Sequence, residues 1–121
     1  FRTGLPLGTE VMVLSRLRQA DDEVMGYDRS IFPVQAVGAD FDGTGSLYAR
    51  MDAQGGRPRR ILQSLKAAEA PADIARHLGV KPGAAVLVIH RIGYGPQGNA
   101  LEDAMSWYRG DRYEYIAEIT G

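Results

Sequence analysis

A short stretch near the end of the chain, residues 101–108, carries side chains suited to binding a small polar ligand. In a strand, successive side chains point to opposite faces, so Glu102, Ser106 and Tyr108 would share one face. Met105 and Trp107 would point the other way, into a core. Burying a row of polar groups without partners is costly. The stretch is therefore expected to be a strand with a binding surface on one face.

Two arginines near the start of the chain could bind an anion. Arg16 and Arg18 lie two residues apart in an expected strand, so they share a face with their charges roughly 7 Å apart. Two guanidinium groups so placed can hold one carboxylate or phosphate. Asp28, from the next expected strand, could orient an arginine or accept a ligand hydroxyl. The alternatives are a solvent-exposed arginine face and, for Asp28, a structural ion pair.

A glycine-bearing loop, GTGSLY at 43–48, leads into an expected helix. Backbone N–H groups at a helix start, and the positive end of its dipole, attract anions. The hydroxyl of Ser46 would add a donor, and Tyr48 could reach the same place from the first turn. Alternatively, Thr44 or Ser46 caps the helix. The two interpretations are compatible.

The expected elements around these residues are mostly strands. Strands are expected at 9–18, 24–32, 59–68, 84–94, 100–108 and 112–119, and helices at 46–53 and 71–78. The second helix has the clearest signals, with Pro71 at its start, Asp73 in its first turn and Gly79 after its end. Short turns between consecutive strands require antiparallel pairing. The fold class is therefore α+β, an antiparallel sheet with short helices packed on one side.

Composition limits the function classes. The 121 residues fit one domain, 1–121, and 14 basic against 15 acidic residues give a net charge of −1, which argues against this segment itself binding nucleic acid. The chain has no cysteine, hence no disulfide or thiolate chemistry, in keeping with a cytoplasmic protein. No apolar run approaches the ~20 residues that span a bilayer. Because the chain opens on Phe1, we expect a further segment upstream.

Three motifs with known chemistry lack the context that they need. DFDGT at 40–44 matches a phosphatase nucleophile loop but follows no buried parallel strand. GYGPQG at 93–98 fits a dinucleotide motif, yet a strand and not a helix follows it. His77 and His90 have no spacing typical of metal ligands. No metal and no cofactor are expected.

Five segments, in order and at family spacing, resemble the UTRA (UbiC transcription regulator-associated) domain of GntR-superfamily, HutC-type bacterial regulators. They are LPLGTEV at 5–11 with RLR at 16–18, YDRSIFP at 27–33, GSLY at 45–48, ARHLGVKPG at 75–83 and YRGDRY at 108–113. Two positions depart from the family pattern: Val24 replaces a frequent proline and Met105 a common arginine. Met105 is expected on the core side, so the pocket residues are unaffected.

The resemblance implies a chorismate-lyase-like fold with a ligand pocket and no catalytic residues. It also implies an upstream winged helix-turn-helix domain that binds operator DNA, a homodimer, and a metabolite effector that relieves repression. The two arginines and the helix start suggest that this effector is anionic, such as a sugar phosphate or organic acid. The ligand-binding residues would be Arg16, Arg18, Asp28, Ser46, Leu47, Tyr48, Glu102, Ser106 and Tyr108. Two alternatives remain open: an enzyme of the chorismate-lyase type, and a dimerisation module with a vestigial pocket.

Overall fold

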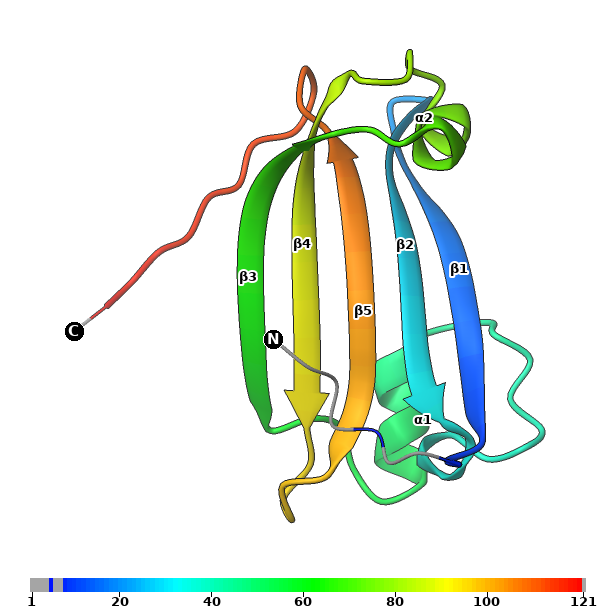
Figure 1. Ribbon diagram of the computed structural model, residues 1–121. Helices are drawn as coiled ribbons and strands as arrows, with labels where there is room; N and C mark the ends of the chain where they lie inside the picture. Colours follow the sequence, from blue (N-terminus) through cyan, green and yellow to red (C-terminus); the bar gives the residue numbers. More distant parts are fainter. Residues whose placement is uncertain (1–4, 6–7, 121) are drawn as a thin grey trace.

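The computed structural model describes residues 5 and 8–120, which form one antiparallel sheet with two short helices (Figure 1). This confirms the α+β fold class. Pro6 and Leu7, in the first family-like segment, lie outside the described residues. Among the described helices, none has the length and apolar character to cross a membrane. The elements are β1 (Val11–Ala20), β2 (Glu23–Pro33), the short 3₁₀ helix η1 (Val34–Ala36), α1 (Leu47–Ala53), β3 (Arg60–Glu69), α2 (Ala72–Leu78), β4 (Ala85–Tyr94) and β5 (Ala100–Arg109).

The strand order is β1-β2-β5-β4-β3, which places β5 at the centre of the sheet. Strands β1 and β2 form a hairpin whose two loop residues, Asp21 and Asp22, both have positive φ (51° and 64°). Such a turn matches the twist of paired strands. The chain after β4 returns as β5 and pairs with both β4 and β2. The predicted ligand strand is therefore flanked by strands on both sides.

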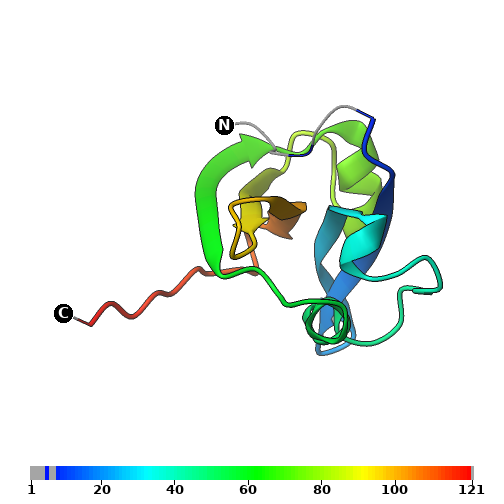
Figure 2. The ribbon, with the colours of Figure 1, turned by 90° about the horizontal axis from the view of Figure 1, so that it is seen from below.

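The two helices cover opposite faces of the sheet (Figure 2). Helix α1 packs through Met51 near Phe32 of β2, whereas α2 packs through Leu78 near Tyr27 of the same strand. Tyr27 and Phe32 are five positions apart in a regular strand, so they point to opposite faces. The expectation of helices on one side was wrong. Periodicity identifies the apolar stripe of a helix, but it does not say which face of the sheet receives that stripe.

The end signals of α2 are confirmed. Pro71 precedes its first residue, and Gly79 closes it in the left-handed region with φ 70°. A residue with a Cβ is strained in that conformation, so glycine favours a stop at this position. The same helix buries Ile74, Ala75 and Leu78 against the sheet.

The strand predicted at 112–119 is not formed, and that prediction was wrong. Residues 113–120, here called the C-terminal arm, are extended but do not pair with any described strand. Tyr113 stacks on Tyr108 with ring centroids 4.0 Å apart. Gln63 of β3 donates through Nε2 to the Tyr115 hydroxyl at 3.3 Å. Beyond this contact the arm leaves the body of the domain (Figure 1).

Candidate ligand-binding site

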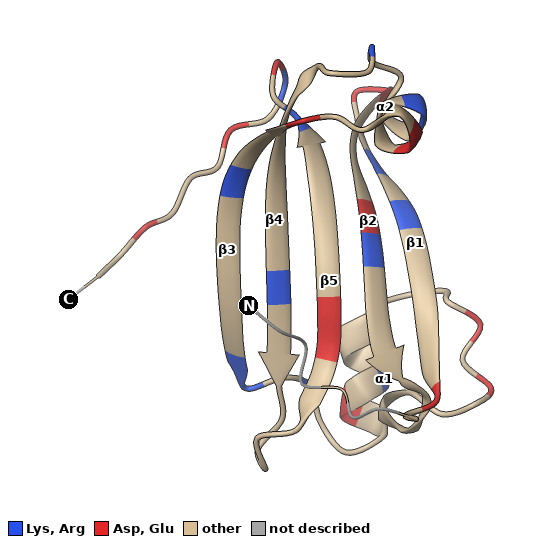
Figure 3. Ribbon diagram, viewed as in Figure 1, with Lys and Arg blue, Asp and Glu red and all other residues tan. Residues whose placement is uncertain are grey.

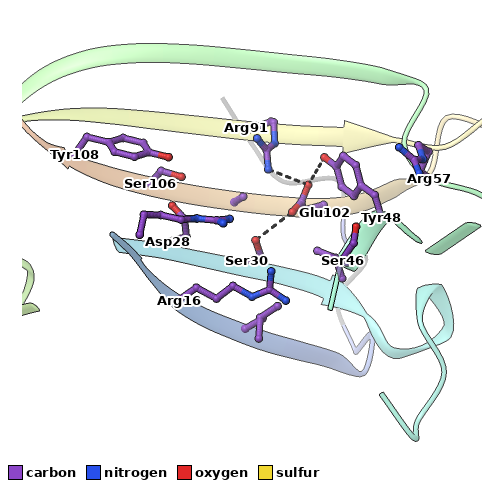
Figure 4. Close-up of a pocket in the computed structure, with 14 residues that line it drawn as sticks. Arg16, Asp28, Ser30, Ser46, Tyr48, Arg57, Arg91, Glu102, Ser106 and Tyr108 are labelled. Atoms are coloured by element: carbon purple, nitrogen blue, oxygen red, sulfur yellow. Dashed lines mark hydrogen bonds and ion pairs between the residues drawn. The ribbon is translucent and has the colours of Figure 1, made fainter. Parts of the chain in front are cut away.

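A cavity of about 500 Å³ lies on the α1 side of the sheet (Figure 4). Strands β1, β2, β5 and β4 form its floor, and the start of α1 and the loop after it form its rim. Every residue predicted to bind ligand lines the cavity, so the structure brings all of them together. The lining residues are Leu14, Arg16, Arg18, Asp28, Ser30, Ser46, Leu47, Tyr48, Arg57, Arg91, Glu102, Ala104, Ser106 and Tyr108.

Glu102 is the centre of the polar network. It is only 1% exposed, and its carboxylate accepts hydrogen bonds from the Tyr48 hydroxyl at 2.7 Å and the Ser30 hydroxyl at 3.1 Å. Arg91 of β4 forms an ion pair with it at 3.5 Å. A buried carboxylate is tolerated when donors of this kind surround it. Glu102 on β5 thus forms its ion pair with an arginine of the neighbouring strand β4.

Tyr48 is held in its neutral form by this environment. Burial, and then the adjacent Glu102 carboxylate, raise the pKa of Tyr48 to about 12. A neutral Tyr48 keeps its proton to donate to Glu102 throughout the physiological pH range. Helix α1 is thereby tied to the centre of the sheet.

This shift predicts an alkaline instability. The unfolded chain releases the Tyr48 proton near pH 10, whereas the folded chain releases it near pH 12. The contribution of Tyr48 is therefore present below pH 10 and lost as the pH rises towards 12. In urea unfolding at pH 9 and pH 11, Tyr48→Phe is expected to lose less free energy of unfolding between the two pH values than the wild type. Equal losses would contradict the raised pKa.

Arg16 and Arg18 share a strand face as predicted, but they have different partners. Arg18 forms an ion pair with Asp28 through its Nε. Arg16 donates from one terminal nitrogen to the carbonyl oxygens of Gly43 at 2.9 Å and Gly45 at 2.8 Å. Arg16 thus fixes the loop that precedes α1, whereas the Arg18–Asp28 contact is an ion pair between the neighbouring strands β1 and β2.

The charges in the cavity are unevenly paired. Arg18 pairs with Asp28, Arg91 with Glu102 and Arg57 with Asp52. Among the described residues, Arg16 forms no ion pair with a carboxylate. Since four arginines and two carboxylates line the cavity, Arg16 offers a positive charge that a ligand can use.

Ser46 and Leu47 begin α1. Ser46 is the N-cap residue, and its Oγ accepts from the backbone N–H of Ala49 at 3.2 Å. Its hydroxyl hydrogen remains able to donate into the cavity. Leu47 is buried in a core cluster with Phe32, Val37 and Met51, and it supplies an apolar part of the cavity wall.

Tyr108, Ser106 and Asp28 form the other end of the cavity. The Tyr108 ring lies across Gly26, where an added Cβ would come within 2.6 Å of the ring. Glycine at 26 therefore makes room for this tyrosine. Burial, and then the Asp28 charge, raise the pKa of Tyr108 above its usual value, so Tyr108 also stays a neutral donor.

Two buried polar atoms in the cavity wall have no hydrogen-bond partner among the described residues: Asp28 Oδ1 and Arg91 Nε. Buried polar atoms are usually satisfied. One is an acceptor and the other a donor. A ligand carrying both hydroxyl or amino groups and an anionic group could satisfy them.

Sequence reasoning missed Ser30, Arg57 and Arg91 among the polar lining residues. Arg91 had a detectable signal, because it is a charged residue within a strongly apolar strand. Arg57 follows two glycines in a loop, and no pattern in the sequence marks it. Within the part of the chain that the structure describes, no group of three or more His, Asp or Glu side chains is placed to hold a metal ion.

Comparison with known proteins gives the family. The UTRA domain model matches residues 2–114. The chain belongs to the UTRA domain family. This UTRA domain is similar to the transcriptional repressor NagR of Bacillus subtilis, at 34% identity over 85% of the chain and 44% of the relative. It is also similar to the repressor PhnF of Mycolicibacterium smegmatis, at 28% identity over 94% of the chain and 48% of the relative.

The chain is also similar in fold to solved structures of GntR-family regulators. A GntR-family regulator of Enterococcus faecalis superposes with a TM-score of 0.87 at 26% identity, over 95% of this chain and 85% of that one. The effector domain of PhnF from Mycobacterium smegmatis superposes with a TM-score of 0.86 at 27% identity, over 98% and 75%. These neighbours show the chorismate-lyase-like fold of UTRA effector-binding domains in GntR-family regulators.

The UTRA domain spans about half the length of the curated relatives that it matches. Those relatives are named as transcriptional repressors and regulators. The names indicate a regulatory and not an enzymatic role, which argues against the lyase alternative.

Proposed function

We propose that this UTRA domain is the effector-sensing part of a HutC-type bacterial transcriptional repressor, and that its cavity binds an anionic metabolite such as a sugar phosphate or small organic acid. The observation that carries the proposal is the charge pattern of the cavity. Four arginines face two carboxylates, and Arg16 has no carboxylate partner among the described residues.

The cavity has polar groups that could bind a ligand at both of its ends. The anionic group would bind Arg16 and the Ser46 hydroxyl, where guanidinium and hydroxyl donors converge. Glu102, Tyr108 and the unsatisfied Asp28 oxygen would accept from, or donate to, hydroxyl or amino groups. The hydrogen bonds that the buried Glu102 carboxylate accepts from Tyr48 and Ser30 would hold these groups in place before the ligand arrives.

Sensing requires coupling to DNA. In the proposed protein, an upstream winged helix-turn-helix domain binds operator DNA in the cytoplasm as part of a homodimer, in keeping with relatives named as HTH-type regulators. The effector would bind one arrangement of the dimer more tightly than the other, which shifts the equilibrium between them. We propose an inducer that lowers operator affinity.

A thermal-shift screen tests the ligand class. Sugar phosphates, amino-sugar phosphates and small organic acids would be compared with the same sugars lacking the phosphate. A ligand at a hundred times its Kd adds about 2.7 kcal/mol of stability, on the order of several degrees in Tm. We expect an anionic compound to stabilise the domain and its neutral analogue not to. Equal stabilisation by the neutral analogue would argue against an anionic effector.

A further inference from the structure

Arg91 places a positive charge in the middle of an otherwise uncharged strand. It is the one Lys, Arg, Asp or Glu residue of β4 (Figure 3). Its side chain lines the cavity and is 36% exposed. In Figure 4, Arg91 and Arg16 lie on opposite sides of Glu102 and Ser30. The cavity therefore has an arginine on each of two facing walls.

The contacts of Arg91 leave part of its hydrogen-bonding capacity unused. Its ion pair with Glu102 is 3.5 Å long, whereas charge-assisted N–H···O bonds are typically about 2.7–2.9 Å long. Glu102 accepts at shorter distances from Tyr48, at 2.7 Å, and from Ser30, at 3.1 Å. Arg91 Nε is buried and has no hydrogen-bond partner among the described residues. Arg91 thus has donors available for a ligand.

The two arginines are too far apart to share one small anionic group. Arg16 is on β1 and Arg91 on β4, so three inter-strand spacings, roughly 14 Å, separate their backbones. Arg16 is held at the loop before α1, and Arg91 at Glu102. Between them the floor carries only small side chains on β2 and β5, which leave room for a short carbon chain: Ser30, Ala104 and Ser106.

Glu102 limits the kind of group that can bind Arg91. An anion with no donor of its own would be repelled by the neighbouring Glu102 carboxylate. A ligand carboxylate with a hydroxyl on the adjacent carbon fits better, because the hydroxyl donates to Glu102 while the carboxylate accepts from Arg91. An ammonium in place of the hydroxyl would add positive charge to a cavity that already has four arginines against two carboxylates.

We propose that Arg91 and Glu102 form a second subsite, which binds a hydroxycarboxylate at one end of the effector, while Arg16 and Ser46 bind a phosphate at the other end. The effector class is then a phosphorylated sugar acid. Such a molecule carries an anionic group for each of the two facing arginines and hydroxyl groups for the polar floor between them. This inference rests on the proposed function and names the chemical class of its effector.

Isothermal titration calorimetry with matched ligand pairs tests the second subsite. Glycerate, erythronate, gluconate and galactonate, each phosphorylated on the carbon farthest from the carboxylate, would be compared with the alditol phosphates in which a hydroxymethyl group replaces that carboxylate. Arg91→Gln removes the charge, and Arg91→Lys keeps it without the planar fork. Arg76→Gln makes the same change as the first variant at an exposed position on α2 and is the matched control.

The measured quantity is the ratio of the two Kd values within a pair. If Arg91 acted only by supporting Glu102, its loss would weaken both members of the pair and leave the ratio unchanged. We expect the wild type and the Arg76→Gln control to bind a sugar acid at least roughly tenfold more tightly than its alditol phosphate. Arg91→Gln should bind the two alike, and Arg91→Lys should keep a smaller preference for the acid.

Three results would overturn the second subsite. Equal binding of both members by the wild type would remove it and leave the anionic effector of the proposed function standing. A preference for the acid that survives in Arg91→Gln would show that Arg91 does not bind the carboxylate. Binding of neither series would exclude phosphorylated sugar acids, whereas the thermal-shift screen decides separately whether another anion is the effector.

Discussion

Replacing Glu102 with alanine is expected to lower the free energy of unfolding by about 2–4 kcal/mol. The carboxylate is 1% exposed and accepts from Tyr48, Ser30 and Arg91. With alanine at position 102, the two hydroxyl groups and the guanidinium group would lose this acceptor. Because the Arg91 side chain is 36% exposed, the loss falls short of that for a fully buried ion pair. A domain of this size should lose roughly 10 °C in Tm.

Urea and thermal unfolding measure this loss. Glu102→Gln keeps the shape and one acceptor oxygen, so it should lose less than half as much stability. Glu114→Ala, in the exposed C-terminal arm, is the matched control and should leave Tm unchanged. If Glu102→Ala unfolds at the wild-type temperature, the network around Glu102 contributes nothing to the fold.

Replacing Arg16 with alanine is expected to weaken binding of the anionic hit by roughly 10- to 100-fold. A hydrogen bond to a charged group is worth about 1.5–3 kcal/mol, and each 1.4 kcal/mol is a tenfold change in Kd. Arg16 is the arginine of the cavity with no carboxylate partner among the described residues. Its charge should therefore act on the ligand more than on the fold.

Isothermal titration calorimetry separates the two effects. Arg76→Ala removes the same charge from an exposed position on α2, on the opposite face of the sheet, and should bind with the wild-type Kd. Arg16→Ala also releases the Gly43 and Gly45 carbonyls, so a small decrease in Tm is expected. Equal affinities for Arg16→Ala and the control would move the anion site away from β1.

Much of the sheet and the site follows from local sequence patterns. Period-two alternation locates β1 and β5 to within two residues, and it correctly puts Glu102, Ser106 and Tyr108 on one face. Proline and glycine locate α2 because they act through backbone geometry at its ends. The glycine-bearing loop and the expected helix start placed Ser46 and Tyr48 at the same cavity, and the family resemblance added Leu47.

Other features depend on contacts that no local pattern encodes. The opposite placement of α1 and α2 is decided by which apolar patch of the sheet each helix meets. Arg91 enters the site only because β4 pairs with β5, which brings it beside Glu102. Residues 112–119 have a strand pattern, yet they pair with none of the described strands of the sheet.

The location of the ligand is the most direct test of the proposed function. Chemical shifts of the backbone amides would be recorded as the anionic hit is added to the ¹⁵N-labelled domain. We predict that the amides of Arg16, Ser46 and Glu102 shift together with one Kd, because they surround one cavity on three different elements. Shifts confined to β3 and the C-terminal arm, with the amides of the cavity unchanged, would contradict the assignment of this cavity as the effector site.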